Sequence, residues 1–304
     1  MSTVLISGAS GFIGSHLASA LSTSGHRVAR LARKRSRRPD ASNTVIWDPE
    51  AGRIDRESLA RLQPDVVINL AGEPIAHRWT AERRKRIRES RIRGTSALSE
   101  ALAMLPTKPS VFLSGSAIGY YGAHRDDDVV DEQSAPGTDF LAETARDWER
   151  ATEAASHASI RVVLLRTGLV LGTNGGVLER MLPLFRFGLG GRLGTGLQWM
   201  SWIAMSDYVA AIEFLIATTT VKGPVNLVAP EPARNKDFSK TLARVLGRPA
   251  IFPVPAIALE VILGTMADNT ILASQRVAPK RLAGAGFEFR HPRLEEALRF
   301  ELNK

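Results

Sequence analysis

A glycine-rich segment directly behind the first apolar run restricts the fold of this chain more than any other feature. The run Val4-Leu5-Ile6-Ser7 predicts a strand, and the segment Gly8-Ala9-Ser10-Gly11-Phe12-Ile13-Gly14 follows it and opens a helical pattern. In such a strand–turn–helix unit the first glycine permits the tight turn, the second lets the backbone approach a pyrophosphate, and the third allows close helix packing. The alternative is a tight turn without a ligand. The residues predicted to hold a dinucleotide here are Gly8, Ser10, Gly11, Phe12, Ile13 and Gly14.

The residues after the second predicted strand indicate which dinucleotide binds. An acidic residue about 20 positions past the loop would bind the ribose hydroxyls of NAD. The chain instead has Ala32-Arg33-Lys34-Arg35 at this place and no acid before Asp40. Arg33 and Lys34 suit the 2′-phosphate of NADP(H), which is the predicted cofactor. A basic surface turn is the alternative.

Short apolar runs alternate with longer helical patterns, which is typical of a parallel sheet covered by helices. We predict an α/β fold, a Rossmann-type doubly wound parallel sheet in residues 1–172 with a returning strand near 225–228. A smaller, mainly helical substrate region is expected in residues 173–304. The remaining expected elements are strands at 4–7, 27–31, 65–70, 110–114 and 161–166 and helices at 12–22, 80–105 and 139–156.

The net charge of +9 at first favours nucleic acid as a partner. Most of this charge lies in two runs, Arg27 to Arg38 and Arg83 to Arg93, and outside them acidic residues outnumber basic ones, 30 to 26. No nucleic-acid-binding motif accompanies either run, so no nucleic-acid partner is expected. A solvated helix face is the alternative for the second run, and phosphates of a cofactor or substrate explain part of both runs at least as well as a nucleic acid does.

Several classes of protein are excluded by composition. The chain has 304 residues and no cysteine, so disulfides and thiolate chemistry are excluded. The six histidines are scattered without metal-ligand spacing, and no metal is expected. The N-terminus lacks a signal-peptide pattern, and the apolar stretch from Val254 to Met266 is too short to span a membrane. We therefore expect a cytoplasmic protein without a membrane partner.

The chain resembles the extended and atypical short-chain dehydrogenase/reductases, and among them the NAD(P)-binding epimerase family of the SDR39U1-like type. Its most family-specific part is the tail 250–304, which resembles a C-terminal domain of unknown function. Residues Trp202-Ile203 with Asp207 are similar to a further motif of the superfamily. The other segments that carry the resemblance are Gly8–Gly14, Asn69–Glu73, Arg78-Trp79, Ser90–Thr95, Ser114–Gly122, Arg166–Gly172, Ser274–Leu282 and Gly286–Phe289.

The resemblance implies further cofactor contacts. Leu70 and Ala71 would lie under the adenosine and ribose, and Leu169 and Val170 would border the nicotinamide. Gly72 and Ser114 are further expected cofactor contacts. Arg91 stands where many extended relatives have an asparagine near the cofactor; it can equally be one more cation of a basic helix face. Ordinary packing at strand ends is the alternative for the apolar residues.

The resemblance also exposes a missing catalytic pair. Short-chain dehydrogenases use Tyr-x-x-x-Lys, in which the lysine lowers the tyrosine pKa from about 10. The chain has three tyrosines, none followed by lysine at the fourth position, and Leu141 and Ala145 align with the pair. Aromatic packing and an exposed carboxylate are the plainer alternatives for the tyrosines and for Glu143. The remaining candidates for substrate hydrogen bonding or proton transfer are Ser114, Ser116, Tyr120, Tyr121 and Glu143.

We therefore expect an NADP(H)-dependent oxidoreductase acting on a small substrate held under the C-terminal region. The alternatives are a catalytically silent NADP(H) sensor or scaffold and, last, a sugar-nucleotide epimerase. The segment Gly188–Gly196 has five glycines and suits a loop over a ligand. Nearby Arg180, Arg186 and Arg192 can bind an anionic substrate or simply face solvent. Because extended relatives often dimerise through the two helices beside the sheet, the resemblance also implies a homodimer.

Overall fold

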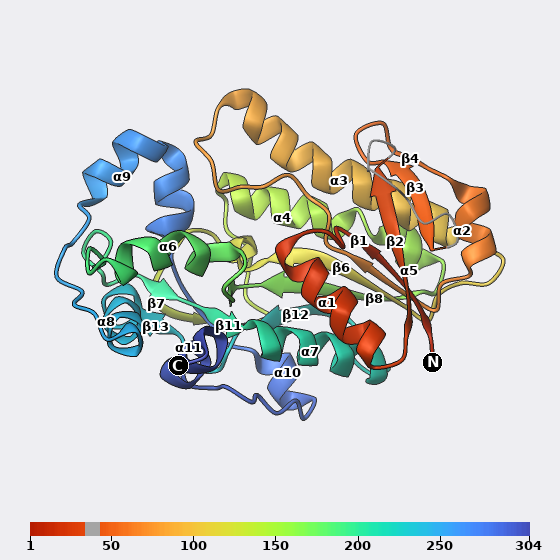
Figure 1. Cartoon of the computed structure of the whole chain (residues 1–304). Helices are drawn as coiled ribbons and strands as arrows, with labels where there is room; N and C mark the ends of the chain where they lie inside the picture. Colours follow the sequence, from red (N-terminus) through yellow and green to blue (C-terminus); the bar gives the residue numbers. More distant parts are fainter. Residues whose placement is uncertain (34–42) are drawn as a thin grey trace.

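The computed structural model describes residues 1–33 and 43–304. These residues form an eight-stranded sheet whose strands run parallel except for the short edge strand β4 (Figure 1). The prediction of a doubly wound parallel sheet is therefore confirmed. In sheet order the strands are β12 (Gly223–Leu227), β8 (Arg161–Thr167), β6 (Val111–Ala117), β5 (Val66–Asn69), β1 (Thr3–Ser7), β2 (Arg27–Arg33), β3 (Thr44–Asp48) and β4 (Arg53–Ile54).

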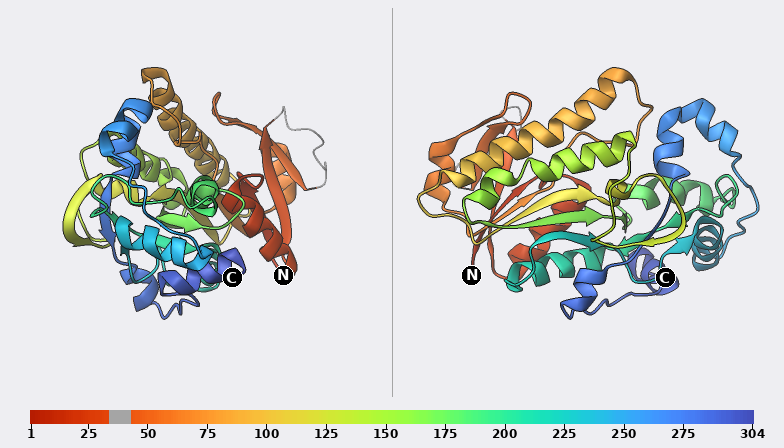
Figure 2. Two further views of the ribbon diagram at one scale, coloured as in Figure 1. Left: turned by 60° about the vertical axis from the view of Figure 1, so that its left-hand side comes forward. Right: turned by 180° about the vertical axis from the view of Figure 1, so that it is seen from behind.

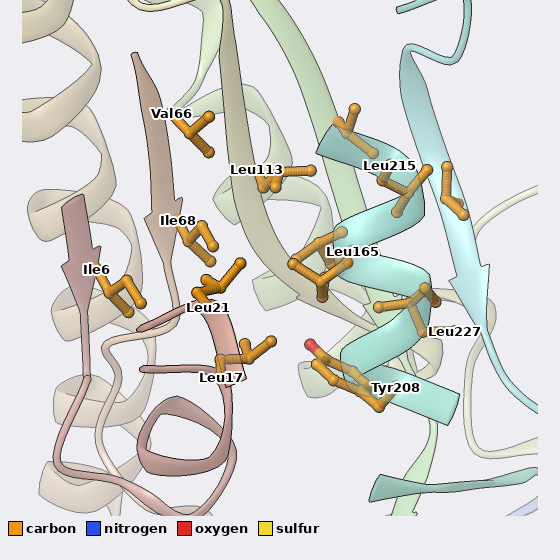
Figure 3. Close-up of a cluster of buried hydrophobic side chains, with 14 of the residues drawn as sticks. Ile6, Leu17, Leu21, Val66, Ile68, Leu113, Leu165, Tyr208, Leu215 and Leu227 are labelled. Atoms are coloured by element: carbon orange, nitrogen blue, oxygen red, sulfur yellow. The ribbon is translucent and has the colours of Figure 1, made fainter. Parts of the chain in front are cut away.

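Helices cover both faces of this sheet. On one face α1 (Phe12–Thr23) and α7 (Met205–Ala217) pack against alternate side chains of the central strands (Figure 3). Leu17 and Leu21 of α1 and Leu215 of α7 are fully buried in this core. On the other face lie α2 (Arg56–Leu62), α3 (Ala81–Ala103), α4 (Phe140–Arg150) and α5 (Glu153–His157).

The structure differs from the sequence prediction in two places within this core. The helix expected over 139–156 is divided into α4 and α5, since the Thr152 hydroxyl donates to the Glu149 carbonyl at 2.7 Å where α4 ends. The sequence prediction also missed β3, β4 and α2. Their apolar residues are few and closely spaced, so neither a strand nor a helix period is clear in 44–62.

Three small strand pairs and further helices lie outside the main sheet, most of them in the C-terminal half of the chain. The pairs are β9 (Leu169–Leu171) with β11 (Trp202–Ala204), β10 (Trp199–Met200) with β13 (Ala233–Arg234), and β7 (His124–Val130) with β14 (Ser274–Val277). The helical elements are α6 (Gly176–Arg186), α8 (Asn235–Leu246), α9 (Ala256–Leu263), α10 (Lys280–Gly284) and α11 (Leu294–Leu302), with short helical turns η1 (Ile118–Tyr121) and η2 (Ala267–Ile271). A separate apolar core joins α6, α8 and α11.

Helix α9 stands at the end of the molecule far from the N-terminus, and none of its residues is buried (Figure 2). Ile257, Val261 and Ile262 are 74%, 69% and 66% exposed. None of the helices formed by residues 1–33 and 43–304 combines the length and apolarity that a membrane crossing requires. The glycine-rich segment 188–196 packs beside residues 249–254, and a Cβ on Gly191 would collide with the Phe252 backbone.

Candidate functional site

The glycine loop after β1 forms a cradle of bare backbone. Gly8 has φ +70°, and the Gly11 amide donates to the Gly8 carbonyl at 2.9 Å. A Cβ on Gly14 would lie 2.8 Å from the Gly8 carbonyl carbon and closer still to its oxygen. Helix α1 begins here, directly behind the exposed loop residues Ser10 and Gly11. It has no side-chain cap and no acid in its first turn, so the partial positive charge of its N-terminus is not compensated by the chain. An uncapped helix end of this kind suits a phosphate.

The Phe12 side chain has a structural partner. Its ring packs against the segment that opens α6, where a Cβ on Gly175 would lie 2.5 Å from Phe12 Cδ2 and one on Gly176 2.9 Å from Cε1. Gly172 makes a similar approach, at 2.9 Å from Cζ. Phe12 therefore ties the glycine loop to the C-terminal half. Its backbone amide, in the first turn of α1, is the part available to a phosphate.

The end of β5 lies against the glycine loop through a hydrogen-bonded serine. The Ser7 hydroxyl donates to Asn69 Oδ1 at 2.6 Å and accepts from the amides of Leu70 and Ala71 at 3.0 and 3.1 Å. A Cβ on Gly8 would lie 3.0 Å from the Leu70 carbonyl carbon. The two predicted cofactor-binding segments are thus held together. Sequence reasoning missed Ser7 and Asn69 in this role, although a polar residue at the end of each buried strand was the available signal.

Arg91 lies beneath this segment. Its NH1 donates to the carbonyls of Glu73 at 2.9 Å and Ile87 at 3.0 Å, and its guanidinium lies 5.2 Å from the centre of the Trp148 ring. A Cβ on Gly72 would lie 3.1 Å from Arg91 Cζ. Burial lowers the pKa of Arg91 to about 10, partly offset by the Glu73 carboxylate, so it stays cationic near neutral pH. Arg91 therefore supports the 72–73 backbone from below.

Thr95 extends this support to α4. Its Oγ1 accepts from Asn69 Nδ2 at 2.8 Å and from Trp148 Nε1 at 2.9 Å. Ser7, Asn69, Thr95 and Trp148 thus form a continuous buried chain from β1 to α4. Sequence reasoning missed Thr95 and Trp148 in this role, although Thr95 belongs to the Ser90–Thr95 segment that carries the family resemblance.

Arg33 ends β2 at the same edge of the sheet as the glycine loop. Ser7 pairs with Leu31 across β1 and β2, so Arg33 lies two residues beyond that pair and is exposed. Lys34 falls outside the described residues. Val170 is buried in β9 within the core of α1 and α7, and the neighbouring Leu169 packs against the core of α6, α8 and α11.

The predicted proton-transfer residues are held in a dense network. Ser116 donates to Glu149 Oε1 at 2.7 Å, and Arg166 binds both oxygens of Glu149 at 2.8 and 3.0 Å. Arg166 NH1 also donates to the Tyr121 hydroxyl at 3.1 Å, and its guanidinium lies 3.5 Å from the centre of the Tyr120 ring. The Ser116 and Tyr121 hydroxyls and the Tyr120 ring therefore already have partners from the chain itself.

Tyr121 is locked within that network. It is fully buried, and its hydroxyl donates to Asn226 Oδ1 at 2.7 Å. Burial raises the pKa of Tyr121 to about 12, against the opposing influence of Arg166. Its phenol therefore remains protonated near neutral pH. Ser114 Oγ is buried and has no hydrogen-bond partner among the described residues.

Helix α4 presents an apolar side chain where the catalytic tyrosine would stand. Leu141, Ala145 and Glu149 follow one another at four-residue spacing and share one helix face. A Cβ on Gly119 would lie 3.4 Å from Leu141 Cβ, and Ala145 is buried. Glu143 is exposed on another face of the helix. The Tyr–Lys pair is therefore absent from the structure as well as from the sequence.

The three arginines predicted for an anionic substrate are placed separately. Arg180 donates to the Ala76 carbonyl at 2.9 Å, and Arg192 donates to the carbonyls of Gly194 and Thr195 at 2.8 and 2.9 Å. Arg186 is exposed at the end of α6. Arg180 and Arg192 thus stabilise local backbone, and the structure does not gather the three into one cluster.

Comparison with known proteins identifies the family. Residues 4–227 match the NAD dependent epimerase/dehydratase family, and residues 254–301 match a domain of unknown function, DUF1731. The chain belongs to the NAD dependent epimerase/dehydratase family. The resemblance drawn from the sequence is therefore confirmed, as is the match of the tail to a domain without an assigned function.

Relatives in this family span nearly the whole chain. An epimerase family protein of Mycobacterium leprae is 43% identical over 98% of this chain and 94% of its own length. The chloroplastic SDR39U1 homolog of Arabidopsis thaliana is 38% identical over 98% of this chain and 86% of its own. The crystal structure of human epimerase family protein SDR39U1 (isoform 2) with NADPH has a TM-score of 0.89 at 30% identity and covers 99% of both chains.

Proposed function

We propose that this chain binds NADP(H) along the edge formed by the glycine loop, the Leu70–Glu73 segment and the end of β2. The cradle around Gly14 carries the proposal, because a Cβ there would collide with the Gly8 carbonyl while the adjoining helix end is uncapped. Such bare backbone at the positive end of a helix matches a pyrophosphate. The human relative solved with NADPH supports the same choice.

The preference for NADP(H) over NAD(H) rests on Arg33. It lies exposed at the end of β2, on the edge of the sheet that carries the glycine loop. A guanidinium binds a phosphate through charge-assisted hydrogen bonds, whereas NAD would need a carboxylate for its ribose hydroxyls. We propose that Arg33, with Lys34, binds the 2′-phosphate.

The reaction we propose is hydride transfer between NADP(H) and a small substrate. The bound cofactor would supply or accept the hydride. The C-terminal region contacts the rest of the chain here through an apolar cluster, in which buried Met266 packs with Trp79 and the partly buried Phe140. Since the Tyr–Lys pair is missing, Ser114 and Ser116 remain the candidate hydroxyls for orienting a substrate oxygen. Ser116 already donates its proton to Glu149 at 2.7 Å, whereas Ser114 Oγ has no hydrogen-bond partner among the described residues.

A non-catalytic NADP(H) sensor is the second candidate. Leu141 at the tyrosine position and the locked, protonated Tyr121 favour it, because neither can take part in proton exchange near neutral pH. A sensor would bind NADP(H) without turning it over. Both functions therefore require NADP(H) binding, but only the oxidoreductase oxidises or reduces the cofactor in repeated cycles.

Calorimetric titration with NADPH and NADH tests the cofactor. We expect wild type to prefer NADPH, Arg33→Ala to lose about tenfold in NADPH affinity with little change for NADH, and Arg248→Ala, an exposed residue just after α8, to match wild type. Equal affinity for both cofactors in wild type would refute the phosphate site. NADPH oxidation against a panel of carbonyl compounds then separates the candidates, since only the oxidoreductase shows turnover.

A further inference from the structure

A hollow lies on the face of the sheet that carries α4 and α5, between these helices and the outer strands β8 and β12. It has a volume of about 1000 Å³. Val162 and Leu164 of β8 form part of its floor, and α4, α5, the loop before β12, η1 and α10 contribute its walls. No residue of the glycine loop lines it. It is therefore distinct from the proposed cofactor site.

The charged side chains around this hollow are mostly cationic. Its two acidic lining residues are Glu149 and Glu153, and the first is already bound through both oxygens by Arg166. The cationic lining residues are Arg146, Arg150, Arg161, Lys222 and Arg281. Five cations from four separate segments around one hollow generate a local positive potential.

Three of these cations have partners on the chain that fix their positions. Arg161 donates to the carbonyls of Leu215, Ile216, Thr218 and Val221 at 3.0 to 3.3 Å, and so caps the end of α7. Arg281 donates to the carbonyls of Lys222 and Pro224, and Arg150 pairs with Asp147 at 3.6 Å. Carbonyl partners leave the charge of Arg161 and Arg281 uncompensated.

The other two cations have donors to offer. The Arg146 Nε atom is buried and has no hydrogen-bond partner in residues 1–33 and 43–304. The exposed Lys222 ammonium forms no ion pair within the same residues. Because the Nε atom is shielded from solvent, an anion in the hollow would contact Arg146 through the terminal nitrogens of its guanidinium. These two residues are therefore the expected direct contacts of an anion.

We propose that this hollow, defined by Arg146, Lys222 and the fixed Arg161 and Arg281, binds a small polyanion carrying two or more phosphate groups. Its volume is in the range of small-molecule sites, which favours a metabolite-sized ligand over a long polymer. Several cations spread over its walls match several phosphate groups better than one carboxylate. The proposal is independent of the proposed cofactor site.

Such a ligand would lie beside the hydrogen-bond network of Ser116, Glu149 and Arg166. Glu149 and Tyr120 line the hollow, and the same Glu149 binds Ser116 while Arg166 stacks on Tyr120. An anion bound near Arg146 would lie close to Glu149, and the two negative charges would repel each other.

Calorimetric titration with sodium tripolyphosphate at about 0.15 M salt, where loose surface attraction is screened, tests the proposal. We expect saturable one-to-one binding to wild type and at least tenfold weaker binding to Arg146→Met/Lys222→Met. Arg53→Met removes an exposed arginine at the opposite edge of the sheet and should change the affinity less than twofold. Unchanged thermal unfolding of the double variant shows that it is folded.

Three results would overturn the proposal. They are the absence of saturable binding to wild type, equal loss in the double variant and in Arg53→Met, and binding of a long polyanion such as RNA but not of tripolyphosphate. Because the double variant leaves the glycine loop untouched, NADPH affinity should be unchanged in it. If wild type fails to bind NADPH but binds tripolyphosphate through Arg146 and Lys222, the cofactor proposal fails and this one stands.

Discussion

The buried ion pair between Arg166 and Glu149 makes the sharpest stability prediction. The two side chains are 3% and 10% exposed, and Arg166 holds both carboxylate oxygens. Glu149→Gln keeps the shape of the side chain but leaves the guanidinium buried without its counter-charge. Breaking a buried pair from one side costs about 3–5 kcal/mol. We expect a loss of that size in the free energy of unfolding, and a fall in Tm on the order of 10 °C.

Urea unfolding followed by tryptophan fluorescence measures this loss. The matched control is Glu153→Gln, an exposed carboxylate one turn along the chain, which should stay within about 0.5 kcal/mol of wild type. In the double variant Glu149→Gln/Arg166→Met both charges are gone, so its loss should be smaller than the sum of the single losses by about 1–3 kcal/mol. A loss below 1 kcal/mol for Glu149→Gln, or strict additivity in the double variant, would refute the buried-pair reasoning.

Four further results are expected. Gly14→Ala should abolish NADPH binding in the calorimetric titration and lower stability by several kcal/mol, since its Cβ would lie 2.8 Å from the Gly8 carbonyl carbon; retained affinity would contradict the cradle. Arg91→Met should weaken NADPH affinity by about tenfold through a displaced 72–73 backbone, whereas the exposed control Arg93→Met should not; equal effects would contradict its supporting role. Because the pKa of Tyr121 is raised to about 12, its stabilisation is complete below pH 10 and is lost as pH rises through 12, so Tyr121→Phe should flatten the alkaline stability profile measured by urea unfolding. Val261→Ser on α9 should change Tm by less than about 2 °C, because the side chain is 69% exposed; a large fall would mean that α9 is covered in solution.

The local chemistry of the cofactor edge could be predicted from the sequence. Gly8, Gly11 and Gly14 stand at fixed spacing behind a strand, and the space that Gly11 and Gly14 leave is bounded by the nearby Gly8 backbone. The main strands could be predicted for a similar reason, since a strand buried on both faces is a continuous apolar run. The likeness to the epimerase family could be recognised because its motifs are equally local.

The side-chain partnerships could not be predicted in this way. Ser116, Tyr120 and Tyr121 suited proton transfer by residue type, but their partners Glu149, Arg166 and Asn226 come from other elements, up to 105 residues away. Arg91 looked like one cation in a basic run until its contacts with Glu73, Ile87 and Trp148 were known. The run of basic residues from Arg83 to Arg93 does not by itself indicate which of its side chains is buried.

The class of fold, the spacing of the three glycines and the absence of the Tyr–Lys pair follow from residues close together along the chain. Only the tertiary structure decided what the remaining polar residues do. It buried Tyr121 and raised its pKa, and it turned Arg91 into a support for the cofactor edge. It also gathered Arg146, Lys222 and Arg281 around one hollow. The physical reason is that burial and pairing depend on distances through space, which are set when the strands and helices pack.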